Sequence, residues 1–242
     1  MRLAALTACI GLVACSLAGP AAAAGTGLTG MWLLDPGSFD KRPVAVLTPE
    51  ARAAVDAQRK AAAAGSATST LSANNKKCLP NGMPGMMTNE FATEILETPG
   101  RITVFNEDNP LPRTIHLDRK TPVAMDPTWN GQSVGRWEGK VLVIDTTNLN
   151  DRTVRVPGGG IPSTGLHIVE RMHLENGGKT LVNQMTLTDP KVLAQPYVRT
   201  VTYSRMEPGS ELWEYVCEVD AEGWSDRFKG DPEGAAAKKA GR

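Results

Sequence analysis

The feature that most constrains the fold is a series of short segments with alternating or apolar side chains, separated by turn residues. Hairpin-type turns follow several of them, as at Pro99-Gly100, Asn176-Gly177-Gly178 and Pro208-Gly209. No helical segment long enough for a crossover separates the strands, so neighbouring strands are expected to pair antiparallel. The pattern predicts an all-β fold, closed as an up-and-down barrel or as a strongly bent sandwich. The expected strands are 28–34, 90–97, 101–106, 113–118, 139–146, 166–175, 180–188, 197–206 and 211–219.

The N-terminal residues 1–24 have the composition of a signal peptide. Arg2 precedes an apolar run over 3–17, and three alanines then offer a cleavage site before Gly25. This predicts export, with the periplasm as the destination. The residues ending at Cys15 also fit a lipoprotein cleavage box, so a lipid anchor at Cys15 is the alternative.

Residues 25–77 are expected to hold the first strand, one peripheral helix and a linker. Thr48-Pro49-Glu50 is a helix start, and the following sequence is rich in alanine up to Gly65, so the helix should bury little surface. Residues 65–77 have linker composition. The barrel domain is assigned to 78–228, and the polar, Ala-rich tail 229–242 is expected to be disordered.

Charge and cysteine content restrict the partners. The chain has 26 basic and 26 acidic residues and no basic cluster, which argues against a nucleic-acid partner. Cleavage before Gly25 would leave two cysteines, Cys78 and Cys217, and an exported protein with two cysteines most often joins them in a disulfide.

Glu170 is the least expected residue in a strand that otherwise has one apolar face. Side chains alternate along 166–175, which places Glu170 among apolar neighbours and places His167 and Arg171 on the other face. A buried carboxylate must be paired or protonated. Two interpretations follow: a structural ion pair with an arginine of another strand, or an acid or base inside the barrel. The apolar neighbours are Leu166, Ile168, Met172 and Leu174.

Asp145, His167 and Arg171 are further candidates for chemistry. Asp145 ends the apolar run 139–146, where it either caps the following turn or places a carboxylate at the barrel mouth. His167 and Arg171 lie four residues apart on one strand face, so they either bind one anion or belong to a solvated face. The histidine spacing argues against a metal site, and no metal or cofactor is expected.

Several other residues are candidates for ligand contact. Trp129 and Asn130 precede a hairpin-type glycine, and Trp137 precedes a second turn; these tryptophans either plug the barrel end or form an aromatic wall for a flat apolar ligand. Three more candidates complete the set. They are His116, together with Arg199 and Tyr203, which share a face of the strand 197–206 with Arg205. The two arginines of that face could form an ion pair with Glu170 or Asp145.

Several of these segments resemble a family of exported, largely uncharacterised proteins of Gram-negative bacteria. The similarity covers about 78–219 and is carried by CLPNGMPGMM, EILETPGRITVFNE, DPTWNGQSVGRWEGKVLVIDTTNLND, LHIVERMHLE and ELWEYVCE. The resemblance implies a calycin-like or lipocalin-like barrel and an exported location. Lys140 departs from the pattern, because an aspartate is common there. The family pattern includes Asp126, Trp129, Asn130, Trp137, Glu138, Asp145, His167, Glu170 and Arg171.

Three functions fit these residues. The first is a cofactor-independent lyase or isomerase acting on a small hydrophobic or aromatic compound, with Glu170 as general acid or base and His167, Arg171 or Asp145 as positioning groups. The second is a lipocalin-like carrier of a small lipophilic ligand. The third is a structural envelope protein. An enzyme should bring two ionisable groups together in one cavity, a carrier should have a mainly apolar cavity, and a structural protein should pair Glu170 with an arginine.

Overall fold

The computed structural model describes residues 26–40, 42–64, 78–120, 124–153 and 155–214. The predicted signal peptide, Cys15, the linker 65–77, Cys217 and the C-terminal tail lie outside these ranges. Export, the lipid anchor and the Cys78–Cys217 disulfide therefore stay predictions.

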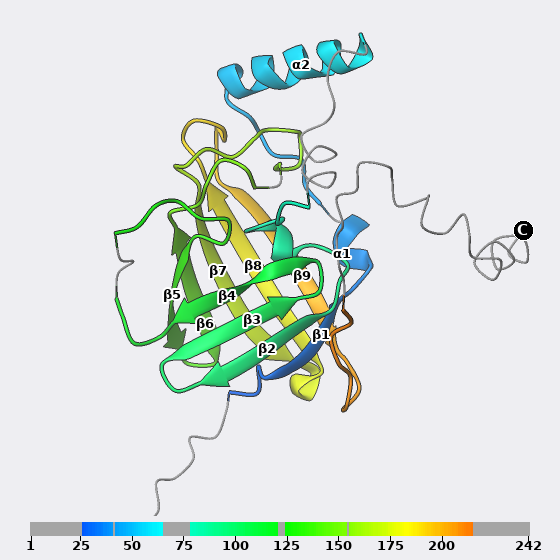
Figure 1. Cartoon of the computed structure of the whole chain (residues 1–242), viewed down its shortest axis with the longest axis vertical. Helices are drawn as coiled ribbons and strands as arrows, with labels where there is room; N and C mark the ends of the chain where they lie inside the picture. The colour runs from blue at the N-terminus through cyan, green and yellow to red at the C-terminus, as the bar shows by residue number, and fades with distance from the viewer. Residues whose placement is uncertain (1–25, 41, 65–77, 121–123, 154, 215–242) are drawn as a thin grey trace, which may run out of the picture.

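In the described part of the chain, the strands form a closed barrel in which each strand pairs with its neighbours in sequence and β1 also pairs with β9 (Figure 1). The predicted all-β barrel is confirmed. The strands are β1 (Gly30–Leu34), β2 (Thr93–Thr98), β3 (Arg101–Asn106), β4 (Asn109–His116), β5 (Gln132–Glu138), β6 (Val141–Thr147), β7 (His167–Glu175), β8 (Thr180–Thr188) and β9 (Tyr197–Arg205).

The pairing of β4 with β5 is parallel, whereas every other pairing in the ring is antiparallel. A ring of nine strands cannot alternate in direction all the way round, because alternation needs an even number. The one parallel contact is short: only Ile115–Ser133 and His116–Val134 are in register. We call this contact between β4 and β5 the seam. It corrects the expectation that all neighbouring strands are antiparallel.

Strand β5 was not expected, because the sequence from 126 to 138 contains mainly turn signals and tryptophans. Gly131, with φ of +64°, immediately precedes the strand, and Gly135 lies within it. A Cβ atom at Gly135 would lie 2.8 Å from Cγ2 of Ile115 and 2.9 Å from Cδ2 of Leu117. The glycine therefore lets β5 approach side chains of β4 and the residue after it. Conversely, residues 211–214 of the last predicted strand are not in a strand.

The helix α2 (Pro49–Ala63) is peripheral, as predicted. The Thr48 hydroxyl accepts a hydrogen bond from the Ala51 amide at 3.2 Å, and Val55 is the buried residue of the helix. Figure 1 shows α2 lying apart from the barrel wall. Three shorter helical segments complete the elements: α1 (Gly37–Asp40), and the 3₁₀ turns η1 (Gly85–Met87) and η2 (Asn176–Gly178).

Side chains fill the barrel interior rather than leaving it open, as is usual for a small barrel. Trp32, Tyr203 and the methionines of the loop before β2 are fully buried. The Tyr203 hydroxyl donates a hydrogen bond to the carbonyl of Met87, which fixes the η1 turn against β9. The methionine-rich loop therefore fills part of the core. Its buried methionines are Met83, Met86 and Met87.

Candidate functional site

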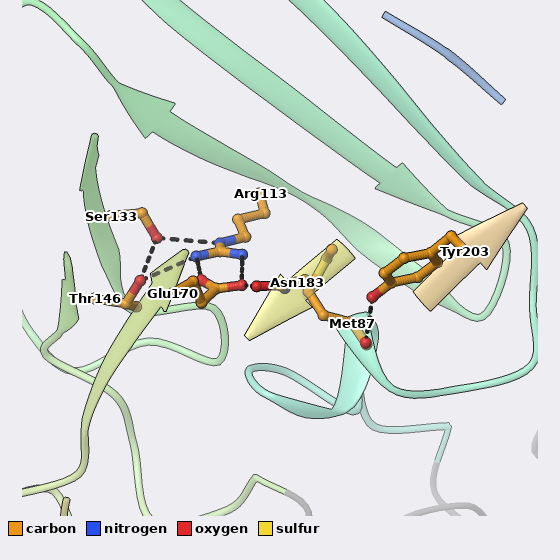
Figure 2. Close-up of polar contacts among 7 residues, drawn as sticks. All are labelled: Met87, Arg113, Ser133, Thr146, Glu170, Asn183 and Tyr203. Carbon is orange, nitrogen blue, oxygen red and sulfur yellow. Dashed lines mark hydrogen bonds and ion pairs between the residues drawn. The ribbon is translucent and has the colours of Figure 1, made fainter. Parts of the chain in front are cut away.

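Glu170 lies inside the barrel, on the face that alternation predicted, and it is paired with Arg113 of β4. Both side chains are almost completely buried, at 0% and 1% exposed. Nη1 of Arg113 lies 3.2 Å from Oε1 of Glu170, and Nη2 donates to Oε2, so the pair is bidentate (Figure 2). The Asn183 amide of β8 donates to Oε1 at 2.9 Å. The geometry is that of a structural ion pair, the first of the two interpretations of Glu170.

Hydroxyl groups from two other strands complete the surroundings of Arg113. Its Nε donates to the Ser133 hydroxyl of β5 at 3.1 Å, and Nη2 donates to the Thr146 hydroxyl of β6 at 3.0 Å. The two hydroxyls are 2.8 Å apart. Every guanidinium nitrogen of Arg113 thus has an acceptor, as a buried charge requires. The network joins β4 to β5 directly across the seam (Figure 2).

The partner of Glu170 comes from β4 and not from β9, where the sequence offered Arg199 and Arg205. Arg205 instead stacks on the Trp32 ring, with its guanidinium carbon 4.0 Å from the ring centroid. Arg113 was missed as a site residue. The signal was present, because Arg113 alternates with Ile115 and Leu117 at the start of the expected strand 113–118.

The other three predicted catalytic residues lie on the outer face of the barrel. Nε2 of His167 lies 3.1 Å from Oδ2 of Asp145, and Nη1 of Arg171 donates to Glu138 at 3.0 Å. These four side chains are 39–45% exposed. Since successive side chains of a strand point to opposite faces, the sheet separates this outer group from Glu170. The expected convergence of Glu170 with His167, Asp145 and Arg171 therefore does not occur.

The outer group consists of two separate sets of contacts: His167 with Asp145, and Glu138 with Arg171 and Arg136. Nη2 of Arg136 lies 2.8 Å from Oε1 of Glu138. Hydrogen bonds from Arg171 and then from Arg136 lower the pKa of the Glu138 carboxyl below its ordinary value.

A groove of about 790 Å³ opens on the barrel at the seam. Because β4 and β5 share only two residue pairs, the strands separate beyond them, and the loops around the β5 start form the groove walls. Residues of both strands and of the β4–β5 and β6–β7 loops line it: Leu111, Pro112, Thr114, His116, Arg119, Met125, Pro127, Thr128, Trp129, Asn130, Gly131, Gln132, Ser133, Asn150, Asp151, Arg152 and Thr164. We call this feature the seam groove.

Three predicted ligand contacts, His116, Trp129 and Asn130, meet in the seam groove. Asn130 is held rigidly: its amide donates to the carbonyl of Leu111 at 3.0 Å and its oxygen accepts from Asn109 at 3.3 Å. Burial, followed by the positive charge of Arg119, lowers the pKa of His116, while the charge of Asp118 acts in the opposite direction. The seam groove therefore combines an aromatic side chain, a fixed amide and a histidine that is mainly neutral at pH 7.

The remaining predicted contacts lie elsewhere. Trp137 lies at the far end of β5 and packs against the core. Tyr203 and Arg199 belong to the inner face of β9 and are buried. None of the three lines the seam groove.

Two further observations concern the described residues alone. They contain no group of three or more histidine, cysteine, aspartate or glutamate side chains placed to hold a metal ion. Within the same ranges, no helix has the length and apolar character needed to cross a membrane.

The fold and the seam groove define a closed β-barrel with a small-molecule-sized recess in its wall. No protein-family model matches the sequence, and no curated protein is significantly similar to it. Among solved structures, the chain is similar to a "REP1-NXSQ fatty acid transporter", with 10% identity and a TM-score of 0.37 over 76% of this chain and 98% of the other. A point mutant of that transporter gives 11% identity and a TM-score of 0.35, over 75% and 100% of the two chains.

Proposed function

We propose that the protein is a binding protein for a small, partly hydrophobic molecule, which it holds in the seam groove. The observation that carries this proposal is the groove itself. Its volume of about 790 Å³ lies within the range of small-molecule sites, and its lining combines a few apolar side chains with a larger number of polar ones. The function is thus the carrier alternative drawn from the sequence.

The lining suggests the chemistry of the ligand. Leu111 and Met125 are 43% and 53% exposed, and together with Trp129 they offer apolar surface at a recess where ligand burial would be favourable. An aromatic or alicyclic ring on Trp129 would gain most from this surface. His116 and Asn130 offer hydrogen-bonding groups for a polar substituent of the same ligand.

A lyase or isomerase reaction has less support. Such a reaction would need Glu170 as general acid or base. Both carboxylate oxygens of Glu170 instead accept hydrogen bonds from Arg113. His167, Asp145 and Arg171 lie on the outer face and could not reach a substrate beside Glu170. A filled structural barrel would account for the ion pair but would give no reason for the seam groove.

Binding is tested by titrating the purified protein with a panel of small aromatic and alicyclic compounds, using calorimetry to obtain dissociation constants. Trp129→Ala should weaken binding of the best compound roughly tenfold or more. Trp213→Ala is the matched control, because Trp213 is 83% exposed and does not line the groove. Equal affinity of the Trp129 variant and the native protein would refute the proposal, and recovery of an altered compound after incubation would favour an enzyme.

A further inference from the structure

A second set of polar groups without partners lies on the inner face of β9. Side chains of Tyr197, Arg199, Val201 and Tyr203 alternate with exposed or half-buried ones, so all four point to the interior. Tyr197 is 5% and Arg199 is 7% exposed. Among the described residues, the Tyr197 hydroxyl and the Nε and Nη2 atoms of Arg199 are buried and have no hydrogen-bond partner.

This contrasts with Arg113, whose guanidinium nitrogens all have acceptors. Nε and Nη2 form one edge of the guanidinium, and their parallel N–H bonds match the two oxygens of a carboxylate. Leaving such donors buried without acceptors is costly, so native structures seldom keep them without a reason. Burial lowers the pKa of Arg199 and raises the pKa of Tyr197, but an arginine side chain stays charged in proteins.

No described carboxylate neutralises this charge. The charged or titratable groups that act on Arg199 are Tyr197, Arg42 and Tyr203, so the only other ion is a second cation. Two described residues that precede α2 contact β9 and the residues before it. The Ser38 hydroxyl accepts from the Thr202 amide at 2.9 Å, and the Val46 carbonyl accepts from the Ala194 amide at 2.9 Å. The groups that act on Arg199 among the described residues thus include no carboxylate.

We infer that Tyr197 and Arg199 form a subsite for the carboxylate group of a small organic acid. The carboxylate accepts two hydrogen bonds from the Nε and Nη2 edge of Arg199, and one of its oxygens also accepts from the Tyr197 hydroxyl. The buried Val201 of the same strand face gives such an acid an apolar neighbour. This subsite uses no residue of the seam groove. Its test is therefore independent of the test of the binding function proposed above.

The test is calorimetric titration of the purified protein with sodium octanoate, compared with octan-1-ol, sodium acetate and sodium sulfate. Octanoate should bind at least tenfold more tightly than the alcohol, which has the same chain without the charge. Arg199→Gln should weaken octanoate binding roughly 10- to 100-fold, since a hydrogen bond to a charged group is lost. Tyr197→Phe should cause a smaller loss, and Trp213→Ala, at an exposed side chain outside both sites, should cause none.

Three outcomes would overturn the inference. The first is no octanoate binding up to about 10 mM, far weaker than a specific site requires. The second is equal binding of octanoate and octan-1-ol, which would show apolar capture without a carboxylate site. The third is a preference for sulfate that depends on Arg199, which would assign the subsite to another class of anion.

The stability of the ligand-free protein gives a second readout. If Arg199 has no partner in the folded protein, Arg199→Met should raise the melting temperature, because a buried unpaired charge is removed while the side-chain volume is nearly kept. If a carboxylate of the chain itself occupied the site, the same substitution would leave that carboxylate unpaired and lower the melting temperature. A lowered melting temperature would therefore refute a site for an added acid.

Discussion

The guanidinium of Arg113 and the carboxylate of Glu170 meet inside the barrel, although β5 and β6 separate their two strands in the ring. Their network reaches Ser133 of β5 and Thr146 of β6. It thereby links β4 to the next three strands. The link lies beside the seam, where only two residue pairs of β4 and β5 are in register. We infer that the pair holds the seam together from the inside.

Removing one member of this pair should destabilise the protein strongly. Arg113→Met leaves the Glu170 carboxylate buried without its counterion, and Glu170→Gln leaves the Arg113 charge in the same position. Each should lower the free energy of unfolding by about 3–5 kcal/mol. Urea denaturation followed by circular dichroism measures this change.

The double variant Arg113→Met with Glu170→Leu is the control for the pair. It removes both charges, so it should be much more stable than the sum of the single changes predicts, and near the native value within about 2 kcal/mol. Additive losses would mean that the side chains act separately and would contradict the account of the pair.

Gly131, just before β5, and Gly139, just after it, test whether the start of β5 depends on close packing. Both have positive φ, at +64° and +62°. A Cβ atom at Gly131 would lie 2.5 Å from the carbonyl oxygen of Thr147, whereas one at Gly139 would meet nothing within 4 Å. Gly139→Ala should cost about 1–2 kcal/mol from backbone strain alone, and Gly131→Ala should cost clearly more. Similar unfolding free energies for the two variants would contradict the close packing at Gly131.

His116 should titrate below its ordinary pKa of 6.5, because burial and the charge of Arg119 disfavour its protonated form. NMR titration of the imidazole protons measures the midpoint. Arg119→Gln should raise it, and Asp118→Asn should lower it further, since the Asp118 carboxylate favours protonation. A midpoint at or above 6.5 in the native protein would contradict this account of the groove.

The same shift gives a pH dependence of stability with a definite sign. The unfolded chain protonates His116 at a higher pH than the folded chain does. The contribution of His116 to stability therefore decreases as the pH falls through 6.5 towards the lower folded pKa, and it levels off below that value. The unfolding free energies of the native protein and of His116→Gln should differ by a constant amount at high pH, and the native protein should lose stability relative to the variant as the pH falls through this range.

Asp145 and His167 should contribute little to stability, in contrast to Glu170 on the same strand as His167. Their side chains are 44% and 39% exposed, so solvent screens their interaction. Asp145→Asn and His167→Gln should each change the free energy of unfolding by less than about 1 kcal/mol. If either variant lost as much unfolding free energy as Glu170→Gln, the outer pair would stabilise the fold more than its exposure indicates.

Much of the fold could be predicted from the sequence because it depends on neighbours along the chain. The alternation in 166–175 identified the inner face that holds Glu170, and the Thr48-Pro49-Glu50 start identified α2. Hairpin turns at Pro99-Gly100 and Asn176-Gly177 set the order of adjacent strands. These properties need only the period of a strand or the chemistry of a turn.

Only the tertiary structure decided which distant residues meet. Strand β5 has weak local signals because it contains or follows glycines that do not favour a strand. Gly131 and Gly135 are needed because a Cβ atom there would lie too close to Leu149 and Ile115, which come from other parts of the barrel. The arginine that pairs with Glu170 is set by the ring order of the strands, which alternation within one strand does not encode. The seam groove likewise arises because nine strands force one parallel contact. The sequence by itself thus determined the strands and their faces, whereas closure of the barrel chose the partners, because closure brings together residues that lie far apart in the chain.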